Sequence, residues 1–313
     1  SGRWQCCAAG GGRGLGEPTM IGVDWGTSSF RAFRIGRDGA IRDTRSALRG
    51  LDTMPDRRFA DTLREEVGPW LAAGEDHVLL SGMIGSRQGW QETPYLPCPA
   101  GAAEIAAALV EIGFDWGQVK LVPGLSATDE AGVAEQMRGE ETQVLGVLEA
   151  MSGSGLACVP GAHSRWVRVE NGRIVGFTTH LTGEAIAALR GHTILARRMR
   201  EGPLDGAPFE AGVRRSQNPG GLLHHVFGAR SQVLAGRLAE TEAGAYLSGI
   251  LIGNEVREAL AGRHGQVVHV IGVPDLTVLY AQAISAYGGY PERHDGEAVA
   301  RGLALIGAQA GWG

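Results

Sequence analysis

The stretch over residues 20–35, MIGVDWGTSSFRAFRI, constrains the fold more than any other part of the chain. An apolar run ends at Asp24, small and hydroxyl-bearing residues follow, and then apolar and polar residues alternate. This pattern predicts a strand, a tight turn and a second strand. Amides and hydroxyls at such a tip can wrap phosphate oxygens, and the carboxylate before them can hold the accompanying magnesium. An ordinary edge hairpin fits these residues equally well, because short motifs often recur by chance.

Composition limits the kind of protein to which this hairpin can belong. The chain has 313 residues, 43% hydrophobic and 20% charged, which suits two globular domains that share a cleft. Its 29 basic and 34 acidic residues give a net charge of −5, which argues against a nucleic-acid partner. The single lysine, Lys120, leaves no GxxxxGK(S/T) phosphate loop and no Schiff-base lysine for an apolar pocket. Any phosphate chemistry therefore needs another architecture.

The cysteines and the N-terminal residues predict the compartment. Cys6, Cys7, Cys98 and Cys158 show neither metal-ligand spacing nor a disulfide framework, which predicts a reducing cytoplasm. No apolar run approaches ~20 residues, so we expect no membrane span. Residues 1–19 are rich in Gly and Arg and lack the apolar core of a signal peptide. We expect them to form a disordered or extraneous extension that does not shape the fold.

A long polar and aromatic loop follows the first part of the chain. The elements expected before it are a strand over 40–48, a helix over 58–73 and a strand over 77–80. The last strand runs into SGMIGSRQGWQETPYLPCPA, and open α/β proteins bind ligands in loops of this kind. Arg87 suits a carboxylate fork, and Trp90 with Tyr95 suits the wall of a sugar-sized pocket. An irregular loop pinned by aromatic packing fits the same residue types.

An acidic pair opens a later helical segment. Residues 101–112 predict a helix and 119–122 a strand, and residues 137–150, MRGEETQVLGVLEA, predict another helix. Glu140 and Glu141 near its start either complement the helix dipole or aim a carboxylate into a cleft as a general base. Spacing alone favours the helix dipole.

The hairpin pattern recurs in the second half of the chain. Residues 156–160 are apolar, the small residues of GAHS follow, and a further pair of strand segments turns at 170–172. A later apolar strand over 267–272 ends in the turn GVPD and is preceded by a helix over 245–260. These repeated parts suggest an internal duplication. Each half would place a turn at the mouth of a shared cleft.

This order of parts resembles the superfamily of actin, hexokinase and the heat-shock ATPases. In that superfamily two phosphate hairpins, connecting helices and an adenosine loop bind ATP between two domains. More closely, the chain resembles the 2-dehydro-3-deoxygalactonokinase family. The matching strings cover nearly everything after residue 19: DWGTSSFRA, SGMIGSRQGW, PYLPCPA, MRGEETQ, PGAHSRW, LTGE and YLSGILIGNE. SGMIGSRQGW and MRGEETQ are strongly specific to the family, whereas DWGTS is shared loosely with many sugar kinases.

The resemblance implies an α/β fold with two ribonuclease H-like (actin-like ATPase) domains. Each would contain a mixed β-sheet flanked by helices, with the active site in the interdomain cleft. The N-terminal domain would cover residues 20–150 and carry the first hairpin and the sugar-acid loop. The C-terminal domain would cover residues 151–313 and carry the second hairpin and the adenosine turn, with its last helix packing back on the first domain.

The resemblance also implies a reaction and a set of site residues. The reaction is transfer of the γ-phosphoryl group of ATP, with Mg²⁺, to the 6-hydroxyl of 2-dehydro-3-deoxy-D-galactonate in galactonate catabolism. Asp24 would anchor the magnesium through its water shell. The nucleotide would be contacted by Gly26, Thr27, Ser28, Ser29, Gly161, Ala162, His163 and Gly272. The sugar acid would be held by Arg87, Gln88, Gly89, Trp90, Tyr95 and Arg230, with Arg87 at its carboxylate.

The general base is assigned by analogy alone. Polyphosphate-cleaving phosphatases of the superfamily use a glutamate in a GEE-type motif that looks similar to GEET in this chain. The analogy implies Glu141 as the base, with Glu140 as the second candidate and Asp24 as the third.

Three residues depart from the family's usual pattern. The second hairpin usually reads PGTHSKW, so Ala162 stands in place of a threonine and Arg165 in place of a lysine. Losing the hydroxyl removes a potential phosphate contact worth ~1 kcal/mol, and arginine changes the geometry of the charge. Pro274, in the adenosine turn, has no N–H. We expect activity to survive these changes, with nucleotide affinity or specificity altered.

Two other function classes share these features. A phosphatase acting on polyphosphate or nucleotide alarmones would keep the hairpins and the glutamate helix but lack the aromatic substrate loop. A non-catalytic nucleotide-binding regulator would account for Ala162 and Pro274. For the kinase, the expected partners are ATP and a small sugar acid, with no nucleic acid and no membrane. Helix-rich stretches leave a homodimer open.

Overall fold

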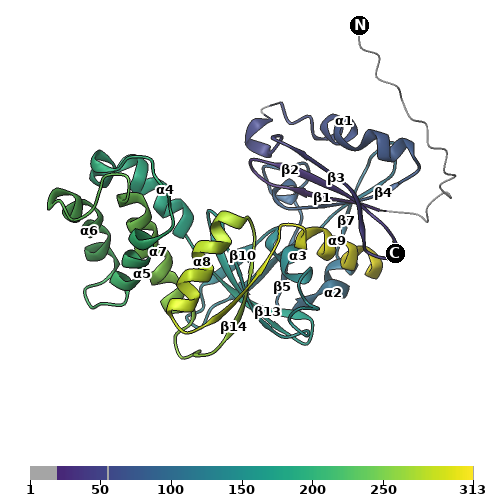
Figure 1. Cartoon of the computed structure of the whole chain (residues 1–313). Coiled ribbons are helices and arrows are strands. Elements are labelled where there is room, and N and C mark those ends of the chain that lie inside the picture. Colours follow the sequence, from purple (N-terminus) through teal and green to yellow (C-terminus); the bar gives the residue numbers. More distant parts are fainter. Residues whose placement is uncertain (1–19, 55, 313) are drawn as a thin grey trace, which may run out of the picture.

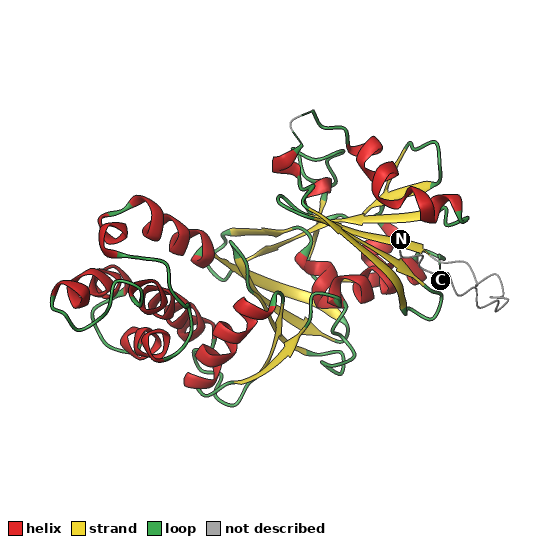
Figure 2. Ribbon diagram, turned by 45° about the horizontal axis from the view of Figure 1, so that its top comes forward, coloured by secondary structure: helices red, strands yellow, loops and turns green. Residues whose placement is uncertain are grey.

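The computed structural model describes residues 20–54 and 56–312, so the predicted extension over residues 1–19 lies outside the described residues. The strands form two six-stranded mixed sheets and one three-stranded sheet within those ranges. Helices flank the sheets, and a group of helices extends from the second sheet at the left of Figure 1. Figure 2 shows the same layers coloured by secondary structure. The predicted α/β class is confirmed.

The first sheet is built around the opening hairpin. Its order is β3 (Ile41–Ala47), β2 (Phe30–Ile35), β1 (Met20–Trp25), β4 (His77–Ser81), β8 (Gln118–Leu121) and β7 (Val110–Ile112). β1 pairs antiparallel with β2 and parallel with β4, so the hairpin tip and the end of β4 lie at the same edge of the sheet. Helix α1 (Phe59–Ala72) buries Phe59, Leu63, Val67 and Trp70, at helical spacing, in one core with β1.

The second sheet repeats this arrangement. Its order is β15 (Tyr290–His294), β14 (Val267–Ile271), β11 (Gly155–Val159), β12 (Ser164–Glu170), β13 (Arg173–His180) and β6 (Ala100–Gly101). As in the first sheet, a three-stranded antiparallel meander is continued by two parallel strands. Helix α8 (Pro274–Ala286) connects β14 to β15. The repeated order supports the internal duplication suggested by the sequence.

Further elements join or extend these two sheets. The third sheet has the order β10 (Ala134–Met137), β9 (Gly124–Thr128) and β5 (Tyr95–Pro97). The helices between β13 and β14 are α4 (Thr182–His192), α5 (Ala207–Ser216), α6 (Leu222–Leu234) and α7 (Ala243–Ala259). Helix α2 (Ala102–Ala107) lies in the N-terminal half, and the 3-10 helices of the described residues are Leu51–Thr53, Met83–Gly85 and Ile194–Arg198.

Two helices pack against each other between the sheets. They are α3 (Glu140–Leu145) and α9 (Ala298–Gln309), and α9 also packs against β1. Added Cβ atoms on Gly146 or Gly302 would overlap backbone oxygens of the other helix, so glycine permits this close approach. One buried core continues from Phe33 of the first sheet through Leu303 to Val159 of the second. The division of the chain at residue 150 stays a prediction.

Two predicted helices are shorter than the sequence pattern indicates. The segment 101–112 forms α2 only as far as Ala107, and residues 110–112 instead pair with β8 as β7. The segment 137–150 is helical only over α3, because Met137 still pairs with β9 and Gly139 adopts φ +106°. In both segments tertiary pairing overrides local helical propensity. Among the described residues no helix has the length and apolarity needed to cross a membrane.

Candidate active site

The predicted turns converge on one cavity of about 730 Å³. Its walls come from the β1–β2 tip, the end of β4, strands β5 and β10, the start of α3, the β11–β12 tip and the β14–α8 turn. The predicted site residues that line it are Asp24, Gly26, Thr27, Ser29, Tyr95, Glu140, Gly161, Ala162, His163 and Gly272. Segments far apart in the sequence therefore form a single site.

The first hairpin tip is a tight turn that backbone hydrogen bonds hold in place. The Gly26 N–H donates to the Ser29 carbonyl at 2.9 Å, which closes the turn. The N–H of Asp52 donates to the Thr27 carbonyl at 2.9 Å. A Cβ on Gly50 would overlap the backbone of residues 27 and 28, so this glycine permits the support. The hydroxyl-bearing tip is fixed in place by backbone contacts.

Asp24 forms an ion pair with Arg31 that was not predicted from the sequence. It lies opposite Arg31 in the β1–β2 register, and the Arg31 Nε donates to its Oδ2 at 3.1 Å. The Nη2 of Arg31 also donates to this oxygen, and its Nη1 donates to the Gly296 carbonyl at 3.2 Å. Arg31 therefore connects the first hairpin with the segment that follows β15. The regular hairpin register provides the signal that could have identified this pair, since residues 24 and 31 are equidistant from the tip.

The second hairpin tip is supported by the start of α4. The Glu184 N–H donates to the Ala162 carbonyl at 2.9 Å, and a Cβ on Gly183 would overlap the Gly161 carbonyl oxygen. The His163 Nε2 lies 2.6 Å from Glu184 Oε2, and both side chains are exposed. The LTGE string of the sequence thus forms the base of this tip.

The predicted adenosine turn is the entry to a helix. Gly272 has φ +153°, in the region that favours glycine, and Pro274 is the first residue of α8. The first N–H groups of a helix have no partner within the helix, so proline at this position removes no helical hydrogen bond. Gly272, Val273 and Leu276 line the cavity.

Two adjacent glutamates have different surroundings. Glu141 is fully buried, and both its carboxylate oxygens accept from the Gly139 N–H, at 2.9 and 2.7 Å. Burial, and then the neighbouring Glu140 charge, raise its pKa to about 8. The Glu140 side chain is 20% exposed and lines the cavity. Burial also raises the pKa of Glu140, while the Arg165 charge opposes this shift.

Glycines allow this acidic pair to approach the first hairpin. Gly82 and Gly139 have φ +95° and +106°, and a Cβ on Gly139 would lie 3.1 Å from the Gly82 Cα. A Cβ on Gly82 would lie 3.3 Å from Asp24 Oδ1. The ends of β1 and β4 and the start of α3 therefore meet with almost no side-chain volume between them. Gly82 belongs to the SGMIGS string, but its conformation was not foreseen.

Two buried arginines also line the cavity. Arg165 is 8% exposed, and its Nε lies 3.7 Å from Glu140 Oε1. Within the described part of the chain, its Nε and Nη1 are buried and have no hydrogen-bond partner. Arg138 donates from Nη2 to the Thr93 carbonyl at 2.9 Å, and its guanidinium lies 4.3 Å from the Tyr95 ring centroid. From the sequence, Arg165 was predicted only to alter the charge geometry of the second hairpin, and Arg138 had no predicted role.

Several predicted residues lie outside the cavity lining. The Ser28 and Arg87 residues are exposed, and Gln88 lines a neighbouring 420 Å³ cavity together with Thr27. Trp90 packs edge-on against Phe114 at 6.0 Å beside the core of the first sheet. The predicted residues outside the lining are Ser28, Arg87, Gln88, Gly89, Trp90, Glu141 and Arg230.

Arg230 lies on α6, and its Nη1 donates to the Ile194 carbonyl at 3.3 Å. This helix belongs to the group at the left of Figure 1, and Arg230 does not line the cavity.

Comparison with known proteins identifies the family of this chain. The family model described as 2-keto-3-deoxy-galactonokinase matches residues 24–306. The chain belongs to this family. The match includes the strands, turns and connecting helices that form the cavity. The resemblance predicted from the motifs is confirmed.

Relatives of the family match over most of their length. The protein named probable 2-dehydro-3-deoxygalactonokinase from Rhizobium meliloti (strain 1021) is 37% identical over 297 residues, covering 93% of this chain and 96% of that protein. The 2-dehydro-3-deoxygalactonokinase of Escherichia coli (strain K12) is 31% identical over 271 residues, covering 86% and 90%.

Solved structures extend the comparison to the fold. A Sinorhizobium meliloti crystal structure that carries the 2-dehydro-3-deoxygalactonokinase name matches with a TM-score of 0.84 at 36% identity, covering 94% of this chain and 99% of that one. Structures that are only 13% and 12% identical match with TM-scores of 0.51 and 0.52 over at least 93% of the chain. At this identity they show the fold alone. The predicted actin-like ATPase fold is confirmed.

Proposed function

We propose that the chain is an ATP-dependent kinase that phosphorylates the 6-hydroxyl of 2-dehydro-3-deoxy-D-galactonate, giving 2-dehydro-3-deoxy-6-phospho-D-galactonate. One observation carries the proposal: in a member of this family, both hairpin tips, the Gly272 turn and a carboxylate line one 730 Å³ cavity. Phosphoryl transfer depends on positioning and on charge stabilisation, and this cavity offers groups for both. The reaction would belong to galactonate breakdown.

The two tips would bind the phosphates of ATP. Thr27 and Ser29 offer N–H and O–H donors from the first tip, where Gly26 has no side chain in the way of a phosphate, and Gly161 and Ala162 offer backbone N–H donors from the second. Gly272, without a side chain, allows the adenosine to approach the β14–α8 turn. Ser28 remains a further candidate at the exposed end of the first tip.

Magnesium would be held at Asp24. Both hydrogen bonds that Asp24 receives from Arg31 go to Oδ2, and the carboxylate lines the cavity, so an oxygen-liganded cation fits beside Oδ1. Mg²⁺ keeps several waters when it is bound by one carboxylate, which agrees with a contact through water. When bound there, magnesium would supply positive charge against the charge that develops on the phosphates. Asp24 would hold its water shell in position.

Glu140 is the better candidate for the general base. Its carboxylate lines the cavity, whereas Glu141 is fully buried and accepts from the Gly139 N–H. Burial raises the pKa of Glu140, which makes it a stronger base, and the nearby Arg165 favours its ionised form. In this role Glu140 would accept the proton of the 6-hydroxyl as the oxygen attacks phosphorus. We therefore prefer the second of the two glutamates predicted from the motif.

Arg165 would serve the transferring phosphoryl group. Its Nε and Nη1 form no hydrogen bond with the described residues and can donate to an anion, and Arg165 lies beside Glu140, where the acceptor hydroxyl would bind. The sugar acid's carboxylate is at C1, at the opposite end of the six-carbon chain from the reacting 6-hydroxyl. A guanidinium beside the base is therefore better suited to the phosphoryl group than to the carboxylate.

The sugar acid would extend toward the third sheet. Tyr95 and Arg138 form a cation–π pair in this wall, with Gln136 nearby in the lining. Arg138 can attract the C1 carboxylate from this side. The loop residues Arg87, Gln88, Gly89 and Trp90 remain predicted contacts, and Arg230 remains a prediction without a cavity contact. Comparing Arg87→Ala with Arg138→Ala decides between the two cations, because loss of the carboxylate contact raises the KM for the sugar acid without a matching rise for ATP.

A coupled ADP-release assay tests the proposed reaction. The purified chain, with ATP and Mg²⁺, is offered the galacto and gluco 2-keto-3-deoxy sugar acids, galactonate and simple hexoses. ADP release should require the galacto acid, and a 6-phosphorylated product should form in equal amount. Phosphate release without an acceptor would instead identify a hydrolase. Nucleotide binding without turnover of any substrate would identify a regulator. A cytoplasmic location and a homodimer remain part of the proposal.

A further inference from the structure

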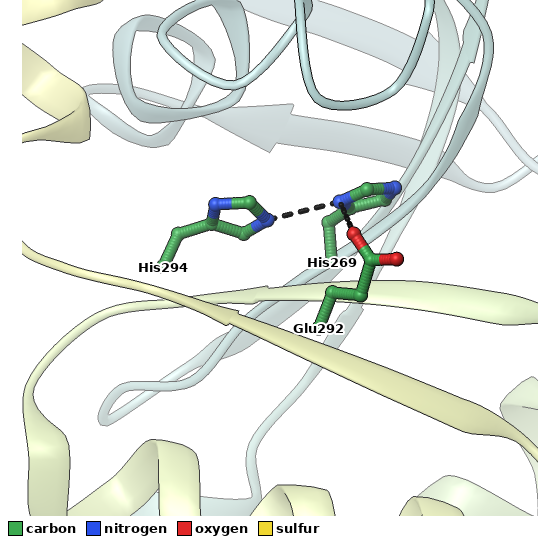
Figure 3. Close-up of side chains that lie close together, drawn as sticks. All are labelled: His269, Glu292 and His294. Atoms are coloured by element: carbon green, nitrogen blue, oxygen red, sulfur yellow. Dashed lines mark hydrogen bonds and ion pairs between the residues drawn. The ribbon is translucent and has the colours of Figure 1, made fainter.

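Two histidines and a glutamate converge at the edge of the second sheet, outside the cavity lining described above. The His269 Nδ1 lies 2.9 Å from His294 Nε2 and 3.5 Å from Glu292 Oε2. Figure 3 shows the two rings and the carboxylate directed toward one another from β14 and β15. All three ligand atoms lie within 4.8 Å of one another.

Strand register produces this convergence. In the parallel β14–β15 pair, His269 lies opposite Glu292 and Ile271 lies opposite His294. Residues two apart on a strand share a face, so all three side chains project from the same face of the sheet. Val268 and Val270 project from the other face into the core with α7 and α8. The three polar groups are therefore adjacent because of the pairing and not because of a sequence motif.

We propose that His269, Glu292 and His294 bind a first-row transition-metal dication of the zinc class, independently of the magnesium that accompanies ATP. Two imidazole nitrogens and one carboxylate oxygen form a donor set that Zn²⁺ and Co²⁺ prefer, whereas Mg²⁺ prefers oxygen ligands alone. A fourth position would be completed by water, because three protein ligands leave one open in a tetrahedral site.

The distances suit such an ion after a small adjustment. In a tetrahedral zinc site with bonds of about 2.1 Å, neighbouring ligand atoms lie about 3.4 Å apart. The 3.5 Å separation between His269 and Glu292 meets this requirement, and the 2.9 Å nitrogen pair needs only a slight opening. Glu292 is 55% exposed, so its carboxylate is free to turn toward an ion and leaves a path for it to enter.

His269 is buried, and the cation that acts on His294 is already paired with a carboxylate. His269 is 4% exposed, so its ring is shielded from solvent, while Glu292 lies on the open side of the site. Arg301 of α9 is the cation that acts on His294, and its Nη2 is paired with Asp295 at 3.0 Å. On the β11 side His269 faces Gly155, whose added Cβ would lie 3.7 Å from the ring.

A bound ion would join the ends of two strands that reach the cavity. β14 ends immediately before Gly272, and β15 ends two residues before Gly296, whose carbonyl accepts from Arg31. Among the described strands, β15 lies at the edge of its sheet and pairs with β14 alone. The metal would therefore fix the edge strand and, through it, both segments at that end of the cavity.

Direct metal titration of the full chain tests the proposal. The tag-free, chelator-stripped protein is titrated with Co²⁺ in the absence of ATP and sugar acid, and the visible absorption of the ion is followed. We expect one site per chain with nitrogen and oxygen ligands, displaced by added Zn²⁺. His294→Ala and Glu292→Gln should weaken binding by about 10- to 100-fold or more, as loss of a metal-site group does. The matched control His192→Ala removes an exposed histidine of α4 and should leave the affinity unchanged.

Each alternative outcome has a distinct signature. Asp24→Asn should leave this binding intact, and loss of binding in that variant would assign the ion to the nucleotide site and overturn the proposal. Thiolate-to-cobalt charge transfer would assign it to cysteine. Absence of Co²⁺ binding, or equal binding by Glu292→Gln, would also overturn it. Glu292 is exposed, so this variant provides a result even if His294→Ala fails to fold. The titration requires no turnover, so its outcome is separate from that of the kinase assay.

Discussion

The two phosphate hairpins share a framework but differ in chemistry. In each, the tip joins the first two strands of an antiparallel meander, and a parallel strand lies on the other side of the first strand. A glycine after the third strand supports each tip, Gly50 in the first case and Gly183 in the second. The same backbone solution therefore occurs twice.

The side chains at the two tips are not equivalent. The first tip presents Thr27 and Ser29 and lies next to Asp24, whereas the second presents Gly161 and Ala162, with His163 paired to Glu184. The first half offers side-chain groups for metal and phosphate, and the second offers mainly backbone donors. The two halves can therefore share a backbone geometry and still carry different binding groups, because the side chains at a tip can change without changing its backbone.

The largest expected effect concerns the helix between the two hairpins. Glu140→Gln should reduce kcat by about 10²- to 10⁴-fold, the usual contribution of a general base, with little change in the KM for ATP. Glu141→Gln is its matched control and should reduce kcat less than about tenfold, because Glu141 does not line the cavity. Steady-state kinetics with both substrates measures the difference. The reverse order would return the base to Glu141, as the sequence motif implied.

The second-largest expected effect concerns the side chains at the two tips. Asp24→Asn should reduce kcat/KM by about 10²- to 10³-fold, because a preorganised electrostatic group is lost at the metal. His163→Ala should reduce it by less than about tenfold, since the second tip is expected to act through its backbone. Titration of Mg²⁺ should also show a raised metal requirement only for Asp24→Asn. Equal losses at the two tips would contradict the proposed division of labour.

A third prediction tests the shared framework. Gly50→Ala and Gly183→Ala should each destabilise the chain by about 1–3 kcal/mol, because the added Cβ overlaps tip backbone that must move. Both should also raise the KM for ATP. Gly113→Ala is a suitable control, since its added Cβ would meet nothing within 4 Å. Denaturant unfolding and ATP kinetics measure the two effects, and an unchanged KM in either tip variant would separate that glycine from phosphate binding.

A fourth prediction uses the raised pKa of Glu141. In the folded chain the pKa of Glu141 is about 8, whereas the ordinary value for a glutamate is 4.5. The associated stability is fully present below pH 4.5 and is lost as pH rises to about 8. Glu141→Gln cannot ionise, so its stability relative to the parent chain should increase over this interval by up to a few kcal/mol. Unfolding at pH 5 and pH 8 checks the sign, and a constant difference would show that Glu141 titrates normally.

The smallest effect restores a side-chain donor to the second tip. Ala162→Thr adds the hydroxyl usual in the family and should lower the KM for ATP by at most about fivefold, the equivalent of ~1 kcal/mol. The valine of Ala162→Val has nearly the shape of threonine but lacks the hydroxyl, so this variant should not lower the KM for ATP. A fall in KM for threonine alone would sharpen the contrast between the tips, whereas equal values for both variants would attribute the result to shape.

Local pattern predicted much of the fold and only part of the site. The hairpins, α1, α7 and the central strands follow from alternation, helical spacing and turn residues. The helices over 101–112 and 137–150 were predicted too long, because pairing of β7 with β8 and of β10 with β9 decided where they begin and end. Tyr95 was predicted from its loop and lines the cavity, while Trp90 of the same loop packs beside the core.

The sequence by itself determined the family, the α/β class and the turns that line the cavity, because these depend on short strings and on regular periodicity. Only the tertiary structure distinguished Glu140 from Glu141, paired Asp24 with Arg31 and brought Arg165 beside the acidic helix. It also brought His269 together with Glu292 and His294. These relationships depend on register and on close approach at glycine between segments distant in sequence, which residue types and local spacing do not specify.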